Sequence, residues 1–168
     1  MPGYIVKYVR FVEALNYRIG RFAMYLLFAL MGVLLYSTFS KVFMTPALWT
    51  LEMAQFFMVA YFFLGGPYSI QMGSAVRMDL LYADWRPTTK AVVDAVTVLF
   101  MLFYLGDLLW GGMESLIYSF QVGERSASPW RPYLWPIKTV MCFALVLMIL
   151  QGTAEFFKDI ARVRGREI

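Results

Sequence analysis

The sequence predicts an all-α integral membrane protein with four transmembrane helices and an amphipathic interfacial helix ahead of the first. Of the 168 residues, 61% are hydrophobic and only 15% are charged, which is far from the composition of a water-soluble domain. Four long apolar runs are separated by connections that hold most of the charges and prolines. Each run is long enough to cross a hydrocarbon layer of about 30 Å as a helix. We therefore interpret residues 1–168 as a single membrane domain.

The first segment, residues 1–21, has the pattern of a helix that lies in the membrane interface. Its aliphatic side chains fall on one side of a helix and its basic side chains on another. The aliphatic ones are Ile5, Val9, Val12 and Ile19, and the basic ones are Lys7, Arg10, Arg18 and Arg21. A disordered basic tail is the open alternative, because so short a helix is marginal alone. A cleavable signal sequence is not expected, since the following apolar run is too long and no A-x-A-like site closes it.

The four spans are expected at about 22–40, 51–72, 90–113 and 137–156. Within the second span, Gly65, Gly66 and Pro67 interrupt the apolar run. Pro67 has no N–H to donate and its ring crowds the preceding turn, so we expect a kink there. The two glycines should allow a neighbouring helix to approach closely.

The distribution of lysine and arginine predicts the orientation. Eleven of the fifteen lie in the two terminal segments and the 73–90 connection, and four lie in the other two connections. Because positive loops stay in the cytoplasm, both termini are expected there, in the inner membrane of a bacterium. Four of the five tryptophans then lie near the outer interface.

Several classes of function are excluded by what the chain lacks. It has no histidine, and Cys142 is its single cysteine. An intrachain disulfide, bis-histidine haem ligation and the usual zinc sites are therefore excluded, and we expect no cofactor and no enzymatic activity. Nucleic-acid binding is not expected either, because the basic residues form no patch. Membrane lipids are the expected surroundings.

Charged residues inside a span are functional candidates by default. If the third span begins near Lys90, Asp94 and Asp107 lie toward its two ends and point to nearly opposite sides. Asp107 and Glu114 share a side, either as a polar edge facing the outer connection or a partner, or as part of an ion pathway. The middle thirds of the spans hold no charge, and a transporter core would normally have polar groups there. The remaining class is an accessory or scaffold subunit.

The order of motifs resembles the small membrane subunit, or DctQ family, of tripartite ATP-independent periplasmic (TRAP) transporters. The residues that carry the resemblance are Trp49-Thr50-Leu51-Glu52, Phe63-Leu64-Gly65-Gly66-Pro67, Val76-Arg77-Met78-Asp79-Leu80-Leu81-Tyr82, Gly123-Glu124-Arg125-Ser126, Trp135-Pro136-Ile137-Lys138 and Leu150-Gln151-Gly152. The chain departs from the family pattern at Ala75, where a histidine is common, and at Cys142 and Ala144, where a Pro-x-Gly is common.

The resemblance implies that transport is carried mostly by partners. A periplasmic binding protein would deliver an organic acid, such as a 2-oxo acid, a hydroxy acid or a C4-dicarboxylate, to a large sodium-coupled membrane subunit that this chain scaffolds. The candidate partner-contact residues are Glu52, Gly65, Gly66, Pro67, Arg77, Asp79, Glu124, Arg125, Arg131 and Lys138. The alternatives are an anchor subunit of a redox complex and a self-assembling small exporter.

Overall fold

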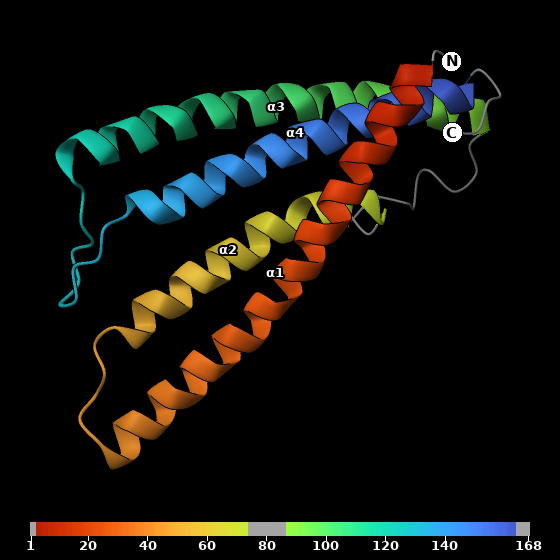
Figure 1. Ribbon diagram of the computed structural model, residues 1–168. Helices are drawn as coiled ribbons and strands as arrows, with labels where there is room; N and C mark the ends of the chain where they lie inside the picture. Colours follow the sequence, from red (N-terminus) through yellow and green to blue (C-terminus); the bar gives the residue numbers. More distant parts are fainter. Residues whose placement is uncertain (1–2, 74–86, 164–168) are drawn as a thin grey trace.

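The computed structural model describes residues 3–73 and 87–163, which form four long helices joined by short connections (Figure 1). The helices are α1 (Gly3–Phe43), α2 (Thr50–Gln71), α3 (Pro87–Val122) and α4 (Trp135–Val163). Each contains a stretch that is long and apolar enough to cross a membrane. The expected class, an all-helical protein with four spans, is therefore confirmed in the described part of the chain.

The first helix differs from the expectation, because the structure shows no separate interfacial helix. Residues 1–21 were expected to form their own element, but α1 runs without a break from Gly3 to Phe43 over 41 residues. At about 1.5 Å per residue it is about 60 Å long, twice the thickness of a hydrocarbon layer. Near Arg21 the sequence changes from charged to apolar, which changes whether the helix favours water or lipid around it. The backbone hydrogen bonds do not depend on this change, so the helix continues through it.

The third helix is also longer than expected. It was expected to end near residue 113, but α3 continues to Val122 and stops where Gly123 adopts a φ of 61°. A glycine in this left-handed conformation is a common helix terminator. Gly112, Leu116 and Ser119 recur at helical spacing and form the less exposed side of this stretch, so residues 114–122 can continue α3 although several of them are polar. Asp107 consequently lies much deeper in the helix than expected.

The second helix continues through Pro67 to Gln71. The glycine–proline segment therefore does not interrupt the helix, although it removes one backbone donor. Met72 follows as the C-cap and donates its N–H to the carbonyl group of Tyr68, and the N–H of Gly73 donates to the carbonyl group of Ile70. Gly73, with a φ of 63°, then ends the described segment.

The helices form a layered arrangement in which α4 is the central element. It contacts α3 on one side and α2 and the first half of α1 on the other, and α1 also packs along α2. Two small apolar clusters hold α1 in place. One joins Val9 and Val12 to Ala154, and the other joins Ala23 to Leu64 and Ala144.

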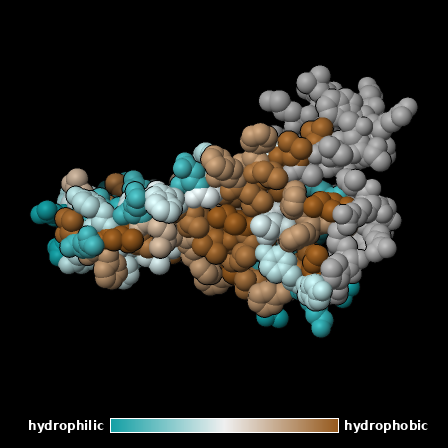
Figure 2. All heavy atoms as spheres, turned by 90° about the horizontal axis from the view of Figure 1, so that it is seen from above, coloured by the Kyte–Doolittle hydropathy of each residue, from teal (hydrophilic) through white to brown (hydrophobic). Residues whose placement is uncertain are grey.

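The two ends of the molecule differ in what they contain. Figure 1 shows the start of α1 and the end of α4 at one end, while the α1–α2 and α3–α4 connections lie at the other. Figure 2 looks onto the molecule from above Figure 1 and shows apolar side chains across the middle of this face, with hydrophilic ones gathered toward one end. An apolar middle with polar ends is typical of a membrane-spanning protein.

Candidate functional site

Glu52 connects the two hairpins at the end where the short connections lie. It sits in the first turn of α2, is 6% exposed, and accepts a 2.8 Å hydrogen bond at Oε1 from the Ser126 hydroxyl in the α3–α4 connection. Its neighbour Thr50 shares a 3.0 Å hydrogen bond with Ser37 of α1. Two helices and one connection therefore meet around the start of α2.

The α3–α4 connection, residues 123–134, is an ordered hairpin. Arg125 and Tyr133 form an antiparallel bridge, and the guanidinium of Arg125 lies 4.3 Å from the centre of the Tyr133 ring and donates to its hydroxyl. Backbone bonds run from Ser126 N–H to Pro132 at 2.9 Å and from Leu134 N–H to Glu124 at 3.1 Å. These contacts give the connection a defined shape at the end of the molecule.

An ion pair anchors this hairpin to α4. Lys138, in the first turn of α4, donates to Glu124 Oε2 at 2.6 Å. This hydrogen bond holds the pKa of the Glu124 carboxyl below its usual range. Of the polar residues predicted to contact a partner here, Glu124 and Lys138 are thus paired with each other, while Arg125 and Arg131 are exposed.

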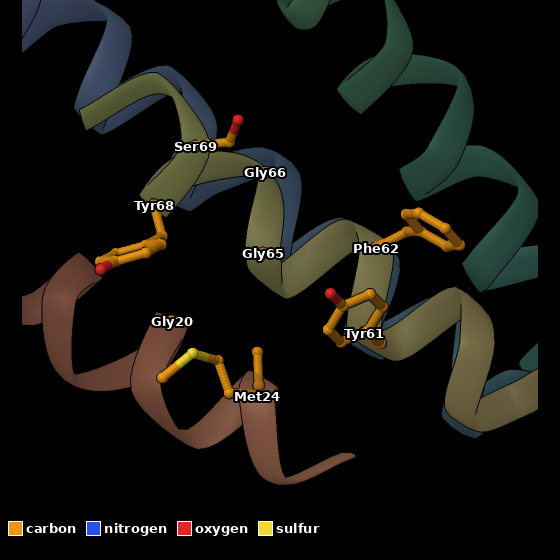
Figure 3. A pocket seen from close by; sticks show the side chains of 9 residues that line it. Gly20, Met24, Tyr61, Phe62, Gly65, Gly66, Tyr68 and Ser69 are labelled. Carbon is orange, nitrogen blue, oxygen red and sulfur yellow. The ribbon is translucent and has the colours of Figure 1, made fainter. Parts of the chain in front are cut away.

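The glycine–proline segment of α2 faces two different neighbours. A Cβ at Gly66 would come within 3.0 Å of Met148 of α4, so this glycine permits close packing. Gly65 instead lines a cavity of about 420 Å³ between α1 and α2, where Figure 3 shows Met24 of α1 facing Tyr61 of α2. Pro67 is buried. The predicted close approach is therefore confirmed for Gly66, and Gly65 borders open space.

The closest glycine contact involves Gly20, which the sequence pattern did not single out. A Cβ there would lie 2.5 Å from Cβ of Tyr68, closer than real atoms come (Figure 3). Gly20 lies on the same side of α1 as Val9, Val12, Glu13 and Asn16, the side that faces α4 and α2. This position in the helical pattern is the feature of the sequence from which its close contact could have been predicted.

Two further predicted contact residues, Arg77 and Asp79, lie outside the described residues.

A polar network joins α1, α2 and α4 near the chain termini. We call it the α1–α4 polar network, and its members are Glu13, Asn16, Gln71, Gln151, Glu155 and Lys158. Asn16 donates to Gln151 at 2.7 Å, and Gln151 donates to Glu155 at 3.1 Å. Lys158 pairs with Glu155 at 3.0 Å and with Glu13 of α1. The Gln71 amide donates to the Glu13 carbonyl at 3.3 Å.

The sequence anticipated only part of this network. The spacing of Glu155 and Lys158, three residues apart on a helix, is a signal for their pairing, whereas the bond from the fully buried Gln151 to α1 has no such local signal. Glu13 and Asn16 were missed. They are the polar residues on the side of α1 that carries Val9 and Val12. When that side packs against another helix, polar side chains on it become buried and need hydrogen-bond partners from the neighbouring helix.

Asp107 differs from the other carboxylates with described side chains, because it is exposed and has no bonding partner among the described residues. It was expected near the outer interface, but it lies in the candidate span Val96–Val122, about 17 Å from one end and about 22 Å from the other. It is exposed, and it has no hydrogen bond or ion pair with the described residues. A charged aspartate at the centre of a lone transmembrane helix costs about 2.5–3.5 kcal/mol. Measured along the helix, Asp107 therefore lies far from both ends of this candidate span.

These features define a class of protein. The buried polar groups are used to fasten helices to one another, and no group of histidine, cysteine or acidic side chains in the described segments could hold a metal ion. The chain is a multi-pass helical membrane protein whose spans are held together at both ends.

The family follows from comparison with known proteins. Residues 30–162 match the family described as "Tripartite ATP-independent periplasmic transporters, DctQ component". The chain belongs to this family and is the small membrane component of a TRAP transporter, which is not an enzyme. Searches of curated proteins and of solved structures find no match. Family membership sets aside the redox-anchor alternative, and it implies a system with a large permease subunit and a periplasmic binding protein.

Proposed function

We propose that this chain is a static scaffold that holds the large permease subunit in the membrane while that subunit moves its substrate. The observation that carries the proposal is the fastening of the spans at both ends. Glu52 and Ser126 join the hairpins at one end, and Lys158 joins α4 to α1 at the other. A scaffold has to resist motion, and buried polar contacts with high geometric demands favour one arrangement of the helices.

We assign both termini to the cytoplasm and residues 123–134 to the periplasmic side of a bacterial inner membrane. The asymmetry of lysine and arginine supports this orientation, and the start of α1 and the end of α4 lie at the same end of the structure (Figure 1). A green fluorescent protein fused after Ile168 should fluoresce, whereas alkaline phosphatase at the same position should be inactive. The reverse pattern would overturn the assignment.

The transported compound is an organic acid in this proposal, and sodium is the coupling ion. The support is the likeness of the chain's connections to family members that serve carboxylates such as 2-oxo acids, hydroxy acids or C4-dicarboxylates. The residues of this chain would not bind the acid themselves. Arg125 and Arg131, exposed in the α3–α4 connection, are the candidates for contact with the binding protein.

The remaining predicted contact residues divide by their surroundings. Glu52, Glu124 and Lys138 shape the α3–α4 connection through bonds within the chain, so they act on the binding protein by positioning that hairpin. Gly65 lies beside open space and is the candidate of the glycine–proline segment for direct contact. Gly66 and Pro67 act through packing, and Arg77 and Asp79 stay as predicted contacts in the 73–90 connection.

Affinity purification in mild detergent tests the proposal. The chain, carrying a tag after Ile168, is expressed with the other components of its transporter, and a much larger multi-span protein should co-purify in a fixed ratio. Reversal of both exposed charges, Arg125→Glu with Arg131→Glu, should preserve this complex and weaken both binding-protein docking and uptake. Recovery of the chain only as a homodimer would overturn the scaffold assignment.

A further inference from the structure

The side of α3 that faces away from α4 is not in contact with any other described helix, and the proposed scaffold function does not yet say what binds there. Among the described residues, α3 contacts α4 alone, and Figure 1 shows it at the edge of the helical layer. Gly112 faces α4, where a Cβ would meet Cys142 at 3.4 Å, and Leu105 is 4% exposed. At about 100° per residue, Asp107 lies about 140° from Gly112 and about 160° from Leu105. Its side chain is therefore directed away from α4.

The side chains around Asp107 form a surface that is unusual for lipid contact. We call it the Asp107 face, and its members are Phe100, Phe103, Tyr104, Asp107, Trp110 and Gly111. The aromatic members are 62–79% exposed. A Cβ on Gly111 would meet no atom within 4 Å, so the backbone is open beside the carboxylate. A glycine next to an unpaired carboxylate leaves room for a partner side chain to reach it.

Building on the scaffold function, we propose that the Asp107 face is the surface on which the large permease subunit docks. The occupant is a transmembrane helix of that subunit with a lysine or arginine opposite Asp107. Lipid tails are excluded as the cover because they offer neither charge nor hydrogen bonds to a carboxylate within the span. A second copy of this chain would bring two carboxylates together across a two-fold axis, which like-charge repulsion opposes.

Charge complementarity also explains why the other intramembrane polar groups do not mark the docking surface. Glu13 and Glu155 share Lys158 as a partner within the chain, and Glu52 is 6% exposed and accepts a hydrogen bond from Ser126, so these carboxylates are turned toward neighbouring parts of the chain. Glu114 accepts a 2.9 Å hydrogen bond from Trp110 within α3. Among the carboxylates with described side chains, Asp107 is thus the exposed one within a candidate span that has no hydrogen bond or ion pair with the described residues.

Site-directed photo-crosslinking locates the interface. A benzoylphenylalanine at Phe103 or Tyr104 should crosslink to the large subunit in the co-expressed complex. The matched control positions are Phe28 and Leu35, which are 68% and 69% exposed on α1, and they should crosslink at least tenfold less. Crosslinks from the α1 positions alone would overturn the Asp107 face while leaving the scaffold function intact. Failure of the large subunit to co-purify at all would instead count against the scaffold function.

Substitution of Asp107 tests the charge pairing. Asp107→Leu should reduce recovery of the large subunit at least tenfold and Asp107→Lys by more, while Asp107→Asn should have a smaller effect. The same Asp107→Leu variant, purified alone, should melt at an equal or higher temperature, because an uncompensated charge has been removed. Thr38→Val is the control, since the Thr38 hydroxyl is already bonded to Leu34. Unchanged recovery with Asp107→Lys would overturn the proposal.

Discussion

Several polar side chains in this protein form ion pairs and hydrogen bonds that join one helix to another. Lys158 shows this best, because it holds two carboxylates that come from different helices, Glu13 of α1 and Glu155 of α4. All three side chains are largely shielded, with exposures of 15–27%. Removal of the lysine therefore leaves two negative charges close together without a cation.

We expect Lys158→Met to lower the free energy of unfolding by about 1–3 kcal/mol, since the shielded carboxylates lose their shared partner. The measurement is thermal unfolding of the purified chain in detergent. Lys7→Met is the matched control, because Lys7 is exposed and has no recorded carboxylate partner in the described segments. Equal melting temperatures for the two variants would contradict the assigned role of Lys158.

The ion pair between Glu124 and Lys138 predicts a response to pH. Because the pKa of Glu124 is lowered in the folded protein, its contribution to stability is present above the ordinary pKa of glutamate, about 4.3, and is lost as pH falls through the lower folded value. A fluorophore attached to Ala127→Cys in a Cys142→Ser background should show falling anisotropy below about pH 4. In a Glu124→Gln variant the anisotropy should already be low at neutral pH and nearly independent of pH. A pH response that persists in this variant would assign the transition to another group.

At the scale of helices, the sequence predicted which segments cross the membrane but not where they end or what they touch. Apolar length is a property of each segment alone, so the four spans could be found directly. The extension of α3 past residue 113 could not, because Glu114, Ser115 and Ser119 resemble loop residues unless their helical sides are considered. The pairing of Asn16 with Gln151 could not either, since it joins residues 135 positions apart.

The contact between α1 and α2 gives a sharp test at this scale. We expect Gly20→Ala to separate the two helices and destabilise the chain by about 1–3 kcal/mol, because the added Cβ would overlap the base of the Tyr68 side chain. Gly32→Ala is the matched control on the same helix, where a Cβ meets nothing within 4 Å. The control should be neutral or slightly stabilising, since alanine favours helices more than glycine does. Similar melting temperatures for the two variants would rule out the close packing.

For the whole molecule, the bond between Glu52 and Ser126 decides whether the two hairpins behave as one body. Glu52 begins α2, and Ser126 belongs to the connection between α3 and α4, 74 residues later. Apart from α4, which contacts both α3 and α2, this bond is a direct link between the hairpins at that end. The proposed docking of a binding protein depends on this link, because it fixes the α3–α4 connection over the membrane domain.

A double-mutant cycle with Glu52→Ala and Ser126→Ala should give a coupling free energy of about 0.5–3 kcal/mol in thermal unfolding. The control cycle pairs Glu52→Ala with Ser128→Ala, whose hydroxyl accepts a bond from the Arg131 N–H instead. The control coupling should be close to zero. Additive effects for Glu52 and Ser126 would show that the hairpins are not joined through this bond.

The bond between Asn16 and Gln151 also bears on the order in which the chain is assembled. Residues 3–20 leave the ribosome before the other described residues, yet the apolar and polar partners of Val9, Val12 and Asn16 lie in the second half of α4 and are made after the other three helices. The beginning of α1 therefore has to wait through the synthesis of three helices before it can be buried. A chain released early, without the final turns of α4, would keep this segment exposed and would be an easy target for the proteases that remove incomplete membrane proteins.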